Sequence, residues 1–137
     1  MMSSAQIQKY QLESEIDSLA KVETIVDELK EQFQIPEDIY GNILVAITEA
    51  VNNAIRHGNK LDPEKKVDFS FEYTEKEYLF KIQDKGSGFD PTSIPDPTLP
   101  ENLDKPDGRG IFIMTNLSDE VKFEDDGRRV EIAFHRS

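Results

Sequence analysis

Three absences narrow the function of this sequence: it has no cysteine, no long apolar run and no excess of basic charge. Without cysteine the chain of 137 residues can form neither a disulfide nor a thiolate metal site, which suits a reducing cytosol. A membrane helix needs about 20 apolar residues. The first residues also show no basic start followed by an apolar core, as a secretion signal would. We therefore expect a soluble, cytoplasmic protein that does not associate with membranes.

The charge of the chain is strongly acidic. It has 28 acidic and 16 basic side chains, for a formal net charge of −12. Lysine and arginine supply most of a protein's affinity for a phosphate backbone, so we expect no direct binding to nucleic acid. One small anionic ligand remains compatible with this charge, because backbone N–H groups, helix N-termini and a bound metal ion can hold phosphates.

Hydrophobic periodicity predicts one domain, residues 1–137, that opens with a strand and two helices. Residues 5–13 alternate loosely between apolar and polar side chains, which predicts a strand. From residue 16 to 33 apolar residues recur at intervals of three and four, which is typical of an amphipathic helix. A second helix opens at Pro36 and continues to a glycine stop at Gly58.

The second half of the chain predicts two hairpins. Residues 67–73 and 77–84 alternate like two strands joined by a polar link. Residues 119–125 and 128–136, joined by an Asp-Gly turn, have the pattern of a closing hairpin. Both hairpins are expected to be antiparallel.

An irregular segment and a short helix lie between the two hairpins. Residues 90–107 contain five of the seven prolines, and a long irregular segment in a compact domain is usually functional or disordered. A helical period resumes over residues 110–117. Together these elements predict an α+β fold: a two-layer α/β sandwich with helices on one face of a mostly antiparallel sheet.

Three polar side chains recur every four residues in the second helix, within the segment ITEAVNNAIRHG. Because this interval is close to one helical turn, Glu49 and Asn53 lie on nearly the same face and can address one small ligand together, and His57 continues the row. A carboxylate beside an amide oxygen suits Mg²⁺, which prefers oxygen ligands and keeps several waters. A solvated helix face would show the same spacing. The small apolar residues on both sides of the row favour a cleft.

The segment QDKGSGFDP follows a predicted strand. Its Asp84 can accept a hydrogen bond from a ligand amine, while Gly86 and Gly88 allow the backbone to approach a ligand closely. An ordinary Asp/Gly turn would have the same composition.

A second Gly-x-Gly motif, in the segment PDGRGIFIM, comes directly before the third predicted helix. At the start of a helix the free N–H groups and the positive end of the dipole favour phosphates. A phosphate would bind well at such a place, although a glycine-rich helix start is common.

Taken in order, these motifs make the parts of one nucleotide pocket, and the sequence resembles the GHKL ATPases, which have the Bergerat fold. EAVNNAIRHG resembles the asparagine box of that family, DKGSGF its first glycine box and GRGIFIM its second, with residues 90–107 in the place of the ATP lid. The short length, the form E-A-x-x-N-A-x-x-H-G and the closing segment MTNLSDEVKFEDDGRRVEIAF are most similar to bacterial anti-sigma factors that are serine-protein kinases. The resemblance covers residues 7–135.

The resemblance implies a role for each motif residue. Glu49 would act as general base on a serine hydroxyl of a partner or on water. Asn53 would bind the Mg²⁺ that bridges the ATP phosphates, and Asp84 would accept a hydrogen bond from the adenine amino group. The other nucleotide-binding residues would be His57 next along the helix, Gly86 and Gly88 beside the base, and Gly108, Arg109 and Gly110 at the phosphates.

The family's partners follow from the same resemblance. It implies an ATP- and Mg²⁺-dependent anti-sigma factor that binds a sigma factor, phosphorylates a serine of an anti-anti-sigma protein of the STAS type, and forms a homodimer. Two alternatives remain. In one, ATP gates partner binding and no phosphate is transferred; in the other, the chain is an interaction domain whose pocket has degenerated.

Overall fold

The structure is a computed structural model that describes residues 6–87 and 106–136. Its elements run along the chain with two short turns of other helix types between them. They are β1 (Gln6–Leu12), α1 (Ser18–Phe33), α2 (Glu37–Asn53), a π-helical turn (Ala54–Gly58), β2 (Val67–Tyr73), β3 (Glu77–Gln83), α3 (Pro106–Leu117), β4 (Glu120–Glu124), a 3-10 turn (Asp125–Gly127) and β5 (Arg129–His135).

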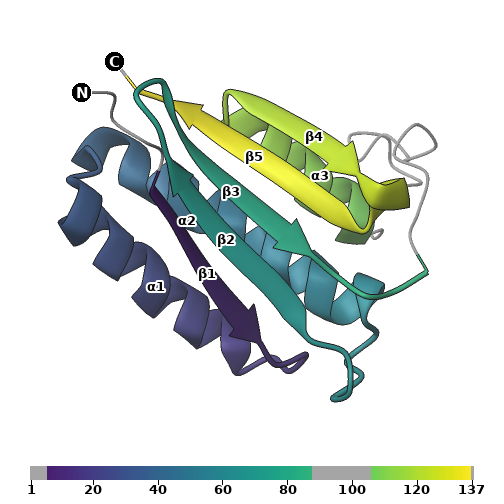
Figure 1. The fold of residues 1–137 in the computed structure, drawn as a ribbon. Helices are drawn as coiled ribbons and strands as arrows, with labels where there is room; N and C mark the ends of the chain where they lie inside the picture. The colour runs from purple at the N-terminus through teal and green to yellow at the C-terminus, as the bar shows by residue number, and fades with distance from the viewer. Residues whose placement is uncertain (1–5, 88–105, 137) are drawn as a thin grey trace.

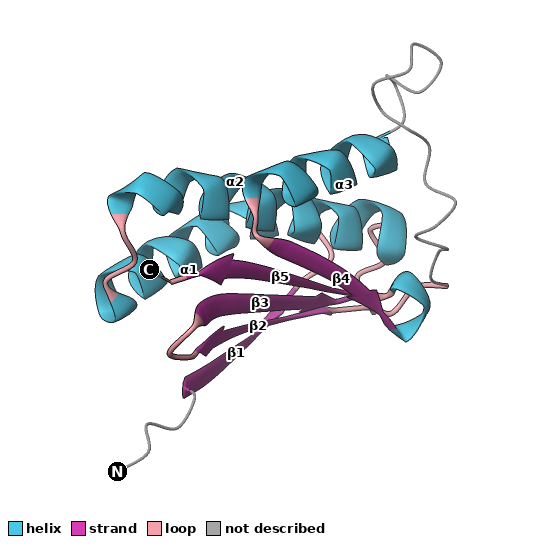
Figure 2. Ribbon diagram, turned by 90° about the horizontal axis from the view of Figure 1, so that it is seen from above, coloured by secondary structure: helices cyan, strands magenta, loops and turns pink. Residues whose placement is uncertain are grey.

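The described strands form one five-stranded sheet in the order β1-β2-β3-β5-β4, and every neighbouring pair is antiparallel. The helices α1, α2 and α3 lie together on one face of this sheet (Figures 1 and 2). The predicted α+β sandwich is therefore confirmed. The strand β5 lies between β3 and β4, so the hairpin of the last two strands pairs with the middle strand of the sheet, β3. The helix α3, which precedes this hairpin, contacts α2.

The helices form where apolar residues recur at helical spacing. In α1 the buried residues include Val22, Val26, Leu29 and Phe33, at intervals of three and four, so one stripe faces the sheet. The chain leaves α1 at Gln34, which adopts a left-handed conformation with φ of 54° and ends the helix.

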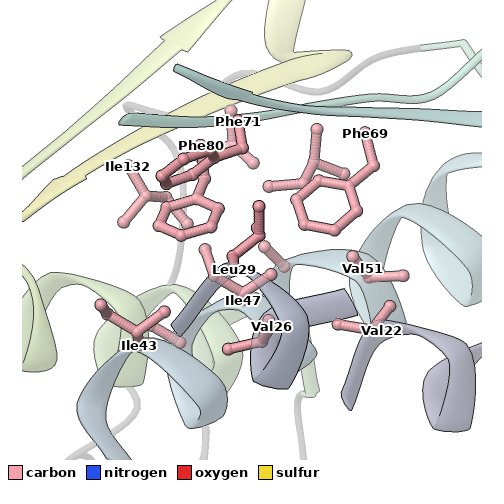
Figure 3. Packing of buried hydrophobic residues seen from close by; sticks show 14 of the residues in the cluster. Val22, Val26, Leu29, Ile43, Ile47, Val51, Phe69, Phe71, Phe80 and Ile132 are labelled. Carbon is pink, nitrogen blue, oxygen red and sulfur yellow. The ribbon is translucent and has the colours of Figure 1, made fainter. Parts of the chain in front are cut away.

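The core lies between the helical layer and the inner face of the sheet (Figure 3). Alternate residues of β2 and β3 point inward, and the rings of Phe69, Phe71 and Phe80 are all buried. The centroids of Phe71 and Phe80 are 5.1 Å apart, which is within the range of favourable aromatic contacts. From the helical side Ile47 and Val51 of α2 pack against these rings (Figure 3). This packing holds α2 firmly on the sheet.

Two helix ends differ from the sequence prediction. The third helix begins at Pro106 and not at residue 110, so the second glycine box forms its first turns instead of preceding it. The residue Pro106 suits a helix start because it needs no N–H partner there. The second helix ends in the π-helical turn, and the left-handed residues that follow are Lys60 and Leu61, with φ of 53° and 59°. Gly58 therefore does not end the helix by the expected left-handed glycine conformation.

In the part of the chain that the structure describes, no helix combines the length and the apolarity that crossing a membrane requires.

Candidate functional site

A pocket of about 240 Å³ opens at the end of the helical layer, where α2 and its π-helical turn meet the end of β3, α3 and the turn between β4 and β5. Its walls come from segments that lie far apart in the sequence. The described residues that line it are Ala50, Asn53, Ala54, His57, Gly58, Lys60, Ile82, Asp84, Ser87, Ile111, Met114, Phe123, Gly127, Arg128 and Val130. Apolar walls with a few polar groups are typical of a site for a small molecule.

At one end of this pocket α2 and α3 approach each other closely. A Cβ added at Gly110 would lie 2.5 Å from Nδ2 of Asn53 and 3.2 Å from its Oδ1. The contact requires glycine at position 110, because any larger residue would displace the Asn53 amide. The asparagine box and the second glycine box thus meet at these two residues.

At the other end of the pocket the Asp84 carboxylate fills a gap between two glycines. A Cβ at Gly58 would overlap the Asp84 side chain, and a Cβ at Gly86 would overlap the carbonyl oxygen of Gly58. The sequence prediction assigned the glycine at position 58 to a helix stop. The structure assigns it to close packing against Asp84, which is the first glycine box reaching the end of the asparagine box.

The Asp84 carboxylate is buried and held in one orientation. Its Oδ1 accepts the backbone N–H of Gly86 at 2.8 Å. Burial raises the pKa of the Asp84 carboxyl, while the Gly86 N–H and the positive charge of Arg128 oppose the rise. Among the described residues this is the one hydrogen bond that the carboxylate accepts, which leaves Oδ2 for a ligand donor.

The residue Arg128, which the sequence analysis missed, holds the first glycine box from the side of the β4–β5 turn. Its Nε donates to the Gly86 carbonyl at 2.8 Å and its Nη2 donates to the Ser87 carbonyl at 3.3 Å. Its own carbonyl accepts the backbone N–H of Asp84 at 2.8 Å. An arginine in a hairpin turn gives no sequence signal for this role.

The residue Asn59 was also missed, because it stands directly after the expected helix stop. It is buried, and its Oδ1 accepts the backbone N–H of Lys85 at 2.7 Å. Its Nδ2 donates to Ser14 Oγ at 2.9 Å and to the Lys65 carbonyl at 3.1 Å. This amide therefore connects the end of α2 with the segment after β3.

Only part of the polar row on α2 lines the pocket. Asn53 and His57 line the pocket, whereas Glu49 is not among the described lining residues. Glu49 lies one turn before Asn53 on the same helical face and is half-buried. Glu49 is therefore one helical turn from Asn53 but does not contribute to the described pocket lining.

Several predicted site residues fall on parts that the structure does not describe. Gly88 and residues 90–105 of the predicted lid lie outside the described residues, and so do the side-chain surroundings of Gly108 and Arg109. Those two residues are nonetheless part of α3, in its first turn.

The fit of the site to Mg²⁺ can be tested on its oxygen donors. Within residues 6–87 and 106–136, no group of three or more His, Cys, Asp or Glu side chains is arranged to hold a metal ion. Mg²⁺ does not need such a cage, because it is commonly bound by one or two protein oxygens together with substrate phosphates and waters. The amide oxygen of Asn53, which lies beside Gly110 and lines the pocket, is a candidate for one such protein ligand.

Comparisons with known proteins agree with this arrangement. Residues 12–134 match the family described as histidine kinase-like ATPase domain, a range that includes all the described pocket-lining residues. The chain is also similar to a serine-protein kinase RsbW of Oceanobacillus iheyensis, with 29% identity over 87 residues. That similarity covers 59% of this chain and 55% of the relative, so the chain spans about half the length of the curated relative it matches.

Proposed function

The chain belongs to the histidine kinase-like ATPase family, and on this premise we propose that it binds ATP and transfers the γ-phosphate to a serine of a partner protein. The observation that carries the proposal is the convergence of three sequence boxes on one pocket, with Asp84 packed on Gly58 and Asn53 packed on Gly110. The similarity to a relative named as a serine-protein kinase supports serine as the acceptor.

The base of ATP would lie at the Asp84 end of the pocket. There Asp84 Oδ2 would accept the adenine amino group, and the apolar side chains of Ile82 and Met114 would pack on the ring. A buried carboxylate that accepts a hydrogen bond discriminates well, because a base without the donor leaves it unpaired. Gly86, and Gly88 in the undescribed segment, would let the backbone lie beside the base.

The phosphates would extend toward Asn53 and the first turn of α3. The first N–H groups of a helix have no partner within the helix, and they favour an anion. Gly108 and Arg109 are in this turn, and Gly110 follows it directly. Asn53 would hold Mg²⁺, which when bound neutralises charge on the phosphates of ATP.

Glu49 would act at the outer end of the triphosphate. Its position one turn beyond Asn53 and outside the lined pocket suits a base that meets an incoming protein hydroxyl. The Glu49 carboxylate would take the serine proton as the serine oxygen attacks the γ-phosphorus, and ADP would leave. His57 continues the helical row and would contact the nucleotide from the pocket wall.

The biological role that best fits this chemistry is that of an anti-sigma factor. We propose that the protein binds a sigma factor, that the phosphorylated partner is an anti-anti-sigma protein of the STAS type, and that two copies of the chain form a homodimer. The resemblance of the three boxes and of the closing segment to bacterial anti-sigma kinases supports these partners. The acidic charge of −12 agrees with protein partners instead of DNA. The proposed location is the cytoplasm.

Titration calorimetry with ATP, with and without Mg²⁺, tests the proposal. We expect micromolar binding, about 8 kcal/mol, that depends on Mg²⁺ and is lost in Asn53→Ala. Labelled γ-phosphate should then appear on a serine of a STAS-domain partner. If neither protein binds ATP, the pocket has degenerated and the chain is an interaction domain.

One observation favours a second candidate, a nucleotide-gated binding module without phosphate transfer. Glu49 does not line the pocket, so ATP could bind and change partner affinity without a base at the phosphorus. Glu49→Gln separates the candidates. A kinase loses transfer in this variant and keeps ATP affinity, whereas a gated module shows no transfer in either protein and the same partner affinity in both.

A further inference from the structure

The buried side-chain amide of Asn59 connects the first glycine box, at the adenine end of the pocket, with two segments that do not line the pocket. Asn59 is 1% exposed, and it follows the π-helical turn that ends the asparagine box. A buried side-chain amide has to pair both its donor and its acceptor, because an unpaired buried polar group destabilises the fold. The contacts of Asn59 therefore indicate which segments it must hold.

The two ends of this amide have different partners. The Nδ2 group donates to Ser14 Oγ at 2.9 Å and to the carbonyls of Lys65 and Lys66 at 3.1 and 3.3 Å. These acceptors belong to the segment after β1 and the loop before β2. The donor end thus anchors Asn59 to a part of the fold that does not line the pocket.

The acceptor end reaches the first glycine box. Oδ1 accepts the backbone N–H of Lys85 at 2.7 Å, and Lys85 lies between Asp84 and Gly86. The neighbouring N–H of Gly86 is taken by Asp84 Oδ1, and the N–H of Asp84 by the carbonyl of Arg128. Of these three successive N–H groups, the middle one depends on Asn59.

The turn that carries Asn59 has an unfavourable backbone. Lys60 and Leu61 are consecutive left-handed residues, a conformation that is sterically unfavourable for residues other than glycine. Strain of this kind persists only where surrounding contacts determine the conformation. The side-chain bonds of Asn59, together with its N–H bond to the Ala54 carbonyl at 2.8 Å, supply such contacts.

We propose that Asn59 is a positioning residue for base recognition: it fixes the Lys85 peptide and so keeps Asp84 Oδ2 aimed at the adenine amino group. This inference rests on the proposed ATP binding. It adds a specificity determinant that touches no ligand and acts through the first glycine box. Without the Lys85 contact the carboxylate would keep its burial, but one of the three successive N–H bonds that set the path of the backbone beside it would be lost.

The test compares two nucleotides in each protein. ATP and purine riboside triphosphate, which differ only in the 6-amino group, are titrated by calorimetry into the unsubstituted chain, Asn59→Ala and Ser18→Ala. Ser18 is a matched control, since it is also buried, its Oγ donates to the Glu13 carbonyl at 2.8 Å, and it does not line the pocket. A lower stability alone leaves the ratio of the two affinities unchanged.

We expect ATP to bind the unsubstituted chain at least about tenfold more tightly than the analogue, as a hydrogen bond to a charged group implies. Ser18→Ala should keep that ratio, while Asn59→Ala should lower it to below about threefold. An unchanged ratio in Asn59→Ala would overturn the inference and leave the proposed function standing. If the unsubstituted chain binds no ATP, both fail.

Hydrogen exchange gives a second measurement should Asn59→Ala not fold. The Lys85 amide lies two residues after the end of β3 and is expected to exchange at least about 100-fold more slowly than an unstructured amide, because Asn59 accepts its hydrogen bond. Slow exchange supports the inference, and exchange at the unstructured rate contradicts it.

Discussion

The Asp84 carboxylate lies against the α-carbon of Gly58 so closely that any side chain at position 58 would overlap it. This contact joins the end of the asparagine box to the first glycine box. It also explains why a helix that ends without a left-handed glycine still requires glycine there. The position of the Asp84 carboxylate, which we propose binds the base, therefore depends on the absence of a Cβ atom at Gly58.

Gly58→Ala is the direct test of this contact. We expect the new methyl group to displace Asp84, to lower the free energy of unfolding by about 1–3 kcal/mol, and to weaken ATP binding at least about tenfold. Denaturant unfolding and calorimetry measure the two effects.

The matched control is Gly41→Ala in the exposed part of α2, where nothing lies within 4 Å of the added Cβ. Here we expect a gain in stability of about 0.5–1 kcal/mol and unchanged ATP affinity, because alanine favours a helix over glycine. Equal ATP affinity in both glycine variants would show that the Gly58 contact does not position Asp84 for the nucleotide.

Gly110→Ala tests the opposite end of the pocket. Its Cβ would lie 2.5 Å from Asn53 Nδ2, so we expect the amide to turn away while the fold is retained. Misplacement of a catalytic group by about 1 Å costs roughly 100-fold in rate, and we expect phosphotransfer to fall by that order. Adenosine, which has no phosphates, should bind with unchanged affinity. Loss of adenosine binding would instead indicate general damage to the pocket.

The raised pKa of the Asp84 carboxyl predicts a dependence of stability on pH. A carboxyl whose pKa is higher in the folded state than in the unfolded state binds protons on folding. Its contribution to the free energy of unfolding is therefore greatest below the unfolded pKa, near 3.8, and is lost as pH rises through the folded value. Asp84→Asn should remove this part of the pH dependence and should be at least as stable as the unsubstituted chain at pH 7.

The same substitution should weaken ATP binding at pH 7, because the neutral amide can turn a donor toward the adenine amino group. Thermal unfolding from pH 4 to 8 and calorimetry at pH 7 measure both effects. If Asp84→Asn is less stable than the unsubstituted chain at pH 7, the charged Asp84 carboxylate does not lower the free energy of unfolding, and this prediction is wrong.

Arg128→Met tests the clamp on the first glycine box. The variant keeps an unbranched side chain in place of the aliphatic part of arginine but loses the bonds to the Gly86 and Ser87 carbonyls, so we expect ATP to bind about five- to tenfold more weakly. Arg129→Met is the control, since Arg129 Nε contacts Glu131 at 3.1 Å and does not line the pocket. Equal ATP affinities in the two variants would show that Arg128 does not support nucleotide binding.

The sequence predicted the fold class well where periodicity was strong. The helix of residues 16–33 and the strands of residues 67–73 agree closely with α1 and β2, because their apolar residues have a clear period. The start of α3 was wrong, since glycine and proline obscure the helical pattern at Pro106. Element ends carry weaker patterns than element centres.

The candidate site divides in the same way. Asn53, His57 and Asp84 were found because their residue types and spacing point to ligand chemistry, and all three line the pocket. Asn59 and Arg128 were missed, because their contacts join residues 26 and 42 positions apart and follow no period. Such contacts are decided by the order of strands in the sheet.

Residue types and their periods already specified which groups are available for chemistry and which faces of the helices are buried, because both depend on local spacing. The tertiary fold decided that Gly58 packs against Asp84 and Gly110 against Asn53. It also decided that the Asn59 amide supports the first glycine box. Those roles arise from distances between segments that β5 brings together by inserting beside β3. Local sequence carries no information about such distances, since they are set by how the two layers pack.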